Sequence, residues 1–165
     1  MLDIDYGALF QSFPPEFATL LVAMTPIGEL RAAIPVAQTA WNLSPFAAAI
    51  WSIIGNIIPV VVILLFLNPI TEFLRRNSKL LNRFFTWLFA RTRKRFTESK
   101  KKYGIFFTLV IFVAIPLPIT GAWTGSIAAY LFGIPFRVAF SAILLGILIA
   151  AGIVTAITMG VISFF

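Results

Sequence analysis

Broken apolar stretches are the first pattern along this chain. The first largely apolar stretch covers residues 13–41 and is broken at the sequence Pro-Ile-Gly-Glu of residues 26–29 and again at Pro35. The two arms, residues 13–25 and 30–41, would each be about 18 Å long as helices, well short of the ~30 Å hydrocarbon core of a bilayer. They predict a re-entrant helical hairpin, with a single proline-kinked full span as the alternative.

The remaining apolar stretches repeat this organisation. Residues 45–67 carry no charge and are long enough to cross a bilayer with some tilt. Residues 104–114 and 122–132 are again short arms, this time around the Pro/Gly-rich break at 116–121, and an apolar segment over 135–165 follows them. The second half therefore also predicts a hairpin followed by a transmembrane helix.

Charge changes the picture because it is concentrated in one segment. The chain is 60% hydrophobic and 12% charged, whereas soluble domains carry about 25% charged residues. Residues 69–103 hold eleven of the thirteen Lys and Arg residues and sum to +9, while the rest of the chain sums to −2. Apolar residues recur there at steps of three and four over 70–88, which predicts a basic amphipathic helix at the cytoplasmic membrane surface.

The two halves resemble each other at a shift of 90 residues. This shift aligns Pro26 with Pro116 and Pro45 with Pro135, and other pairs also match. A hairpin and one crossing in each half would give the halves opposite orientations, which is the inverted-repeat plan of many transporters. Both termini would then lie outside the cell, whereas four plain spans would place both in the cytoplasm.

These observations predict an all-α polytopic membrane protein built from two inverted repeats. Each repeat would be a Pro/Gly-broken re-entrant hairpin followed by a transmembrane helix. We expect a single membrane domain over 1–165, with repeats at 1–68 and 104–165 joined by the basic cytoplasmic segment 69–103. The expected location is the plasma (inner) membrane, in several passes.

Composition excludes several kinds of chemistry. The chain has no Cys and no His, so thiolate nucleophiles, histidine-based triads and the common zinc sites are excluded. No phosphate-binding glycine loop followed by Lys-Ser or Lys-Thr is present. We expect no enzymatic activity, no cofactor, no metal and no nucleic acid. The expected partners are membrane lipids and a small-molecule or lipid substrate, and a homodimer would suit so small a core.

A pair of charges near the middle of the first apolar stretch is the sharpest functional signal. Glu29 and Arg31 have apolar residues on both sides, and a charge at membrane depth usually faces a partner or a water-filled cavity. A carboxylate there could exchange a proton, and an arginine could hold an anionic group. The alternative is a structural pair that fixes the hairpin, or charges that reach the membrane interface.

Other polar residues near the breaks are weaker candidates, because each also has a structural interpretation. The further candidates for substrate contact or proton coupling are Gln38, Asn56, Thr120, Trp123 and Thr124. The residues expected to break the hairpins are Pro26, Pro35, Pro116, Pro118 and Gly121. Irregular backbone at membrane depth is tolerated only where it is buried or lines a cavity, so both breaks are candidate sites.

Three motifs carry a family resemblance. They are Pro-Ile-Gly-Glu-Leu-Arg-Ala-Ala-Ile-Pro at 26–35, Gly-Asn-Ile-Ile-Pro at 55–59 and Pro-Leu-Pro-Ile-Thr-Gly-Ala-Trp-Thr-Gly at 116–125. The chain resembles the small multidrug export protein family, which implies efflux of small molecules. Its layout is also similar to the DedA (VTT-domain) superfamily, which implies lipid transport or scrambling, although the second hairpin here lacks the arginines of that superfamily.

Three functions are consistent with these features. The first is a secondary transporter that exports small amphipathic or lipid-like molecules and is coupled to protons through Glu29. The second is an uncoupled lipid scramblase or flippase of the DedA type. The third is a membrane-organising protein that works through its basic amphipathic helix.

Overall fold

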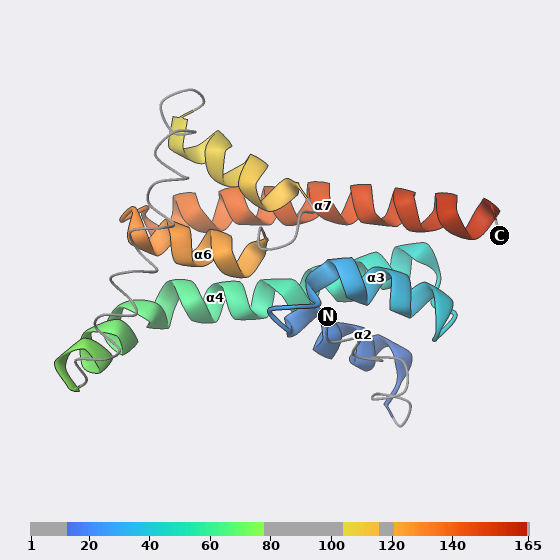
Figure 1. Ribbon diagram of the computed structural model, residues 1–165, viewed down its shortest axis with the longest axis horizontal. Coiled ribbons are helices and arrows are strands. Elements are labelled where there is room, and N and C mark those ends of the chain that lie inside the picture. The colour runs from blue at the N-terminus through green and yellow to red at the C-terminus, as the bar shows by residue number, and fades with distance from the viewer. Residues whose placement is uncertain (1–12, 78–103, 116–120, 165) are drawn as a thin grey trace. The chain divides into compact units, whose positions relative to one another are not determined.

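Helices make up every regular element of the computed structural model in the parts that it describes, residues 13–77, 104–115 and 121–164 (Figure 1). For residues 68–77 it describes the backbone alone. The helices in chain order are α2 (Pro15–Met24), α3 (Glu29–Thr39), α4 (Pro45–Asn77), a helix over Gly104–Ala114, α6 (Ala122–Leu131) and α7 (Phe136–Phe164). The predicted all-α class is confirmed for these residues.

Two of the helices are long and apolar enough to cross a membrane. They are Pro45–Leu67, with 23 residues, and Phe136–Phe164, with 29 residues. The first has the predicted bounds, but α4 continues beyond it to Asn77, so the start of the predicted amphipathic segment belongs to the same helix. The remainder of the basic segment, residues 78–103, lies outside the described residues.

The first apolar stretch does form two short helices, but only one of its two predicted breaks is present. Residues 25–28 separate α2 from α3, and the two helices pack against each other. The prediction that Pro35 breaks the hairpin is wrong, because Pro35 lies inside α3. A proline cannot donate a helix hydrogen bond, but α3 continues on both sides of it, and Ala40 N–H still donates to Val36 O at 2.8 Å.

The chain divides into two compact units, and both long helices contribute to each of them. The first unit comprises residues up to Pro59 together with those from Ile147 onward, and the second comprises Val60–Gly146. Each unit thus contains one pair of short helices, the beginning of the long helix that follows this pair, and the end of the other long helix.

Close backbone packing holds α2 on α4 in the first unit, and α3 packs against α2. Val22, Ala23 and Ala33 form a small buried cluster between α2 and α3. A Cβ atom on Gly55 of α4 would lie 2.9 Å from the Cβ of Ala23 and would collide with the carbonyl oxygen of Leu20. Glycine is therefore required at position 55, since small residues let the backbones of apolar helices approach closely.

The second unit contains the same type of contact. A Cβ atom on Gly146 of α7 would lie 3.0 Å from the carbonyl oxygen of Val110 and 2.7 Å from the Cβ of Val113. In both units a glycine of the long helix therefore meets a carbonyl of the first short helix and a side chain three residues later. Gly125 of α6 also packs against Val113.

The two long helices bury the same register of positions. The two helix sequences can be aligned so that Gly55 corresponds to Gly146. In this alignment four buried positions of α4 correspond to four buried positions of α7, namely Ala48 to Ala139, Ser52 to Ile143, Asn56 to Ile147 and Val60 to Ala151. The two faces differ in chemistry at the middle positions, where α4 carries a serine and an asparagine and α7 carries two isoleucines.

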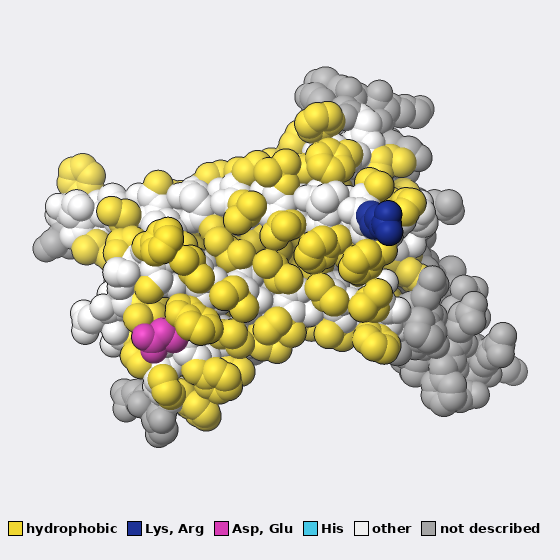
Figure 2. All heavy atoms as spheres, turned by 180° about the vertical axis from the view of Figure 1, so that it is seen from behind, with side chains coloured by type: hydrophobic (Ala, Val, Ile, Leu, Met, Phe, Trp, Pro, Cys, Tyr) yellow, Lys and Arg dark blue, Asp and Glu magenta, His cyan; other side chains and the backbone are white. Residues whose placement is uncertain are grey.

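Large apolar side chains dominate the exposed surface of the described helices, and Figure 2 shows one such face. Ile50, Ile54 and Ile58 form an exposed row along α4 at intervals of one turn. Hydrocarbon solvates such a surface, whereas water does not. On α7, a Cβ atom placed on Gly152 or Gly160 would have no described atom within 4 Å, so these two glycines are not packed against another described helix there.

Candidate functional site

The turn between α2 and α3 is held by the side chain of Thr25. Its hydroxyl donates to the carbonyl of Val22 at 2.8 Å and accepts from the N–H of Gly28 at 3.1 Å. The carbonyl of Thr25 in turn accepts from the N–H of Glu29 at 3.1 Å. A Cβ on Gly28 would lie 2.7 Å from the Thr25 hydroxyl oxygen, so the turn needs a glycine there.

This turn places Glu29 in an unusual backbone conformation. Glu29 has φ of +46°, in the left-handed region that L-residues with a side chain avoid at a cost of about 1–2 kcal/mol. The residue is also only 6% exposed. Strained conformations of this kind persist where the surrounding structure imposes them, and they cluster at functional sites.

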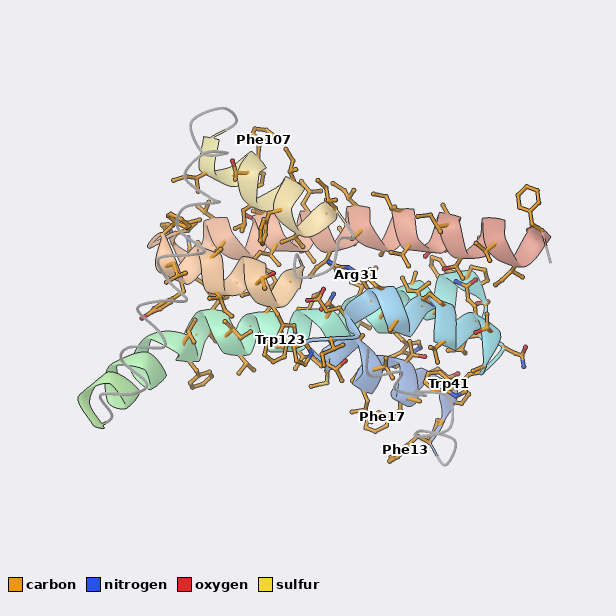
Figure 3. The ribbon with its side chains drawn as sticks, in the orientation of Figure 1. Phe13, Phe17, Arg31, Trp41, Phe107 and Trp123 are labelled. Carbon is orange, nitrogen blue, oxygen red and sulfur yellow. The ribbon has the colours of Figure 1, made fainter. Side chains whose placement is uncertain are left out.

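Arg31 is the charge partner of Glu29. Its guanidinium nitrogen lies 3.9 Å from a carboxylate oxygen of Glu29, and its side chain is partly buried. Residues two apart on a regular helix point in different directions, so the left-handed start of α3 is what turns the carboxylate toward the guanidinium. Figure 3 shows Arg31 near the beginning of α3. This distance lies within the limit for an ion pair and is longer than a hydrogen bond.

The tip of the same turn is apolar and exposed. Ile27 is 75% exposed, and Pro26 is exposed beside it. The polar groups of the turn thus point inward while its outer surface is apolar. A turn that faces water is expected to have a polar outer surface, whereas a turn that faces hydrocarbon is expected to have an apolar one with its polar groups inside.

Two further predicted residues lie in the same unit and carry unsatisfied polar atoms. Both amide atoms of Asn56 and the amide nitrogen of Gln38 are buried with no hydrogen-bond partner among the described residues. Asn56 is 1% exposed and Gln38 is 9% exposed. Glu29, Arg31, Gln38 and Asn56 all belong to the first unit.

The second predicted break is described only in part. Thr120, Pro116 and Pro118 lie outside the described residues. Gly121 precedes α6, and its carbonyl accepts from the N–H of Gly125 at 2.8 Å and from the hydroxyl of Thr124 at 3.3 Å. Trp123 and Thr124 are partly buried and belong to the second unit.

Sequence reasoning missed Ser52. Its hydroxyl is fully buried and has no partner among the described residues, one helical turn before Asn56. The spacing of four residues between two polar side chains in an uncharged span was the signal that could have identified it. No group of three Asp or Glu residues that could hold a metal occurs in the part of the chain that the structure describes.

The comparison with protein families matches residues 29–153 to the family described as "Putative small multi-drug export protein". No curated protein and no solved structure matches the chain. The matched region begins at Glu29 and includes Arg31, Asn56, all of α4 and the part of α7 up to residue 153. The family and the two apolar helices together indicate a membrane protein. The chain belongs to the small multi-drug export protein family.

Proposed function

We propose that this protein is a secondary transporter of the plasma membrane that exports small amphipathic or lipid-like molecules. The observation that carries the proposal is Glu29, a buried carboxylate held on a strained backbone next to Arg31. A charge inside an apolar helix pair is costly, and such residues in membrane proteins usually mark an ion or substrate pathway. The family description supports export.

Glu29 is the coupling group in this proposal. Its carboxyl takes up a proton from one side of the membrane and releases it on the other, and the two states differ by one charge. The ion pair with Arg31 supports such a role, because protonation of Glu29 removes the negative charge that faces the guanidinium. When Glu29 is protonated, Arg31 becomes available to an anionic or polar substrate group.

The proposed architecture is a pair of inverted repeats. α2 and α3 enter and leave the membrane on one side, and the exposed apolar tip at Ile27 supports this arrangement. The matching glycine contacts at Gly55 and Gly146 support a common ancestry of the two halves. Residues 69–103 face the cytoplasm, lipids surround the helices, and the protein acts without enzymatic chemistry, nucleic acid or cofactor. Alternating exposure of the two hairpins would move the substrate.

Proteoliposomes provide the test. The purified protein is reconstituted, a pH gradient is imposed, and movement of the fluorescent cation ethidium across the membrane is followed. We expect gradient-driven movement that Glu29→Gln reduces at least tenfold. Glu16→Gln is the matched control, because Glu16 is an acidic residue in the first turn of α2 and is not buried, so it should leave transport unchanged.

Two other outcomes would replace the proposal. Bidirectional movement of a fluorescent phospholipid without any gradient, unaffected by Glu29→Gln, would identify a scramblase. Activity in cells that survives loss of both Glu29 and Arg31, but not loss of the apolar residues within 70–88, would identify a membrane-organising protein.

A further inference from the structure

The buried face of α4 carries polar atoms that the fold does not use. The hydroxyl of Ser52 and both amide atoms of Asn56 have no hydrogen-bond partner among the described residues, and the two residues are 0% and 1% exposed. They lie four residues apart and so occupy the same side of the helix. Water cannot satisfy such groups inside a bilayer, so leaving them unpaired is costly.

The behaviour of other hydroxyls shows that Ser52 had an alternative. Hydroxyls in these helices commonly donate to the carbonyl four residues earlier, which needs no external partner. Those that do so are Thr19, Thr39, Ser126, Ser141, Thr158 and Ser163. Ser52, with Thr108 and Thr155, makes no such bond. Its hydroxyl therefore keeps both its donor and its acceptor capacity.

The neighbouring backbone adds another acceptor. Pro59 lies inside α4 and carries no N–H, so the carbonyl of Gly55 cannot receive the usual helix bond from residue 59. Gly55 is adjacent to Asn56. This turn of α4 thus has a backbone carbonyl, a hydroxyl and an amide that are not used in the hydrogen bonds of the helix.

The second long helix shows that packing does not require these polar groups. At the positions of α7 that correspond to Ser52 and Asn56, the chain has Ile143 and Ile147, and both are fully buried. An apolar side chain therefore suits this face of the helix. The serine and asparagine of α4 then call for an explanation other than packing.

We propose that Ser52 and Asn56 form a hydrogen-bonding site for an uncharged hydroxyl or amide group of the exported molecule, and that this site opens to water during transport. The proposal rests on the proposed export function and adds a substrate class to it. An amide and a hydroxyl each donate and accept, so together they recognise a neutral group that does both. The full burial of both residues corresponds to a closed state of the site.

Single-cysteine labelling tests the site, because the chain has no cysteine of its own. Ser52→Cys and Asn56→Cys are made in the full-length protein, reconstituted without a pH gradient, and treated with the charged thiol reagent methanethiosulfonate ethylsulfonate. We expect both to react at least tenfold faster than Ile143→Cys and Ile147→Cys, which are buried at the corresponding positions of α7. Equal protection of all four cysteines would overturn the proposal.

A protection experiment identifies the bound group. Chloramphenicol is uncharged and carries hydroxyl and amide groups, whereas tetraphenylphosphonium is a lipophilic cation without hydrogen-bonding groups. We expect chloramphenicol alone to slow labelling at Ser52→Cys and Asn56→Cys. Labelling that chloramphenicol does not slow would mean that water alone fills the site, which would overturn the proposal.

A stability measurement keeps the result interpretable if the cysteine variants fold poorly. Asn56→Ile copies the residue found in α7, and we expect its thermal unfolding midpoint to equal or exceed that of the parent protein. A lower midpoint would indicate a structural role for Asn56 and count against the site. None of these readouts depends on Glu29, so labelling can succeed even where the proton-coupling experiment fails, and a failure of the site can be distinguished from a failure of proton coupling.

Discussion

Glu29 combines two costs at one residue, a buried carboxylate and a left-handed backbone. A purely structural residue at the start of α3 would avoid both, since a glycine would accept the backbone and an apolar side chain would accept the burial. The presence of a carboxylate at this position therefore has no purely structural explanation.

The strain at Glu29 can be measured by comparing two truncations. Glu29→Gly and Glu29→Ala both remove the carboxylate, but only glycine adopts φ of +46° without a steric cost. We expect Glu29→Gly to be about 1 kcal/mol more stable than Glu29→Ala in thermal unfolding of the detergent-solubilised protein. Ala33→Gly, within the regular part of α3, should instead destabilise. An alanine variant as stable as the glycine variant would contradict a strained Glu29.

The turn that joins α2 and α3 depends on one side chain, that of Thr25. Thr25 satisfies Val22 O and Gly28 N–H with one hydroxyl. Thr25→Val keeps the shape but removes both bonds, and the Gly28 N–H loses its acceptor at a cost of about 1–3 kcal/mol. We expect faster hydrogen–deuterium exchange in a peptide covering 22–30, whereas Thr25→Ser should exchange like the parent. Unchanged exchange in Thr25→Val would show that the hydroxyl does not hold the turn.

Helix packing gives a second prediction at this scale. Gly55→Ala places a Cβ against the backbone carbonyl of Leu20, which cannot move aside as a side chain could. We expect a loss of about 1–3 kcal/mol in stability. Gly152→Ala is the matched control in the other long helix, since nothing lies within 4 Å of its Cβ position, and it should be neutral or stabilising by up to about 1 kcal/mol. The thermal unfolding midpoints of the two variants are compared with that of the parent protein. A Gly55→Ala midpoint equal to or above that of the parent would contradict the prediction.

Hydrophobic pattern alone located the elements better than it located the site. The uncharged run 45–67 and the break at 25–28 were predictable because charge, proline and glycine punctuate the chain there. Pro35 was assigned wrongly, because a proline is read as a break even where packing on both sides keeps the helix continuous. Ser52 was missed because a membrane helix is apolar on all sides, so hydrophobic periodicity does not mark its buried face, and only the four-residue spacing from Asn56 singles it out.

At the scale of the whole chain, both compact units use the same parts. Each has two short helices and segments of both long ones, and each has a long-helix glycine against the first short helix. The buried register of α4 and α7 also coincides. One half nevertheless carries the charged pair and the Ser52–Asn56 pair, while the corresponding positions of α7 are apolar. The halves thus share a packing plan and differ in their polar chemistry.

The inverted-repeat proposal makes a prediction about the sides of the membrane. α7 has 29 residues and would be about 43 Å long, enough for one crossing of a ~30 Å core, whereas α2 and α3 are each too short to cross. One crossing in each half places both termini outside and the basic segment inside. We expect an impermeant thiol reagent applied to intact cells to label Ser12→Cys and Ser163→Cys, and to label Ser99→Cys only after the membrane is opened. Four full spans, two in each half, would instead leave all three positions unlabelled in intact cells, because an even number of crossings in each half keeps both termini on the cytoplasmic side with the basic segment.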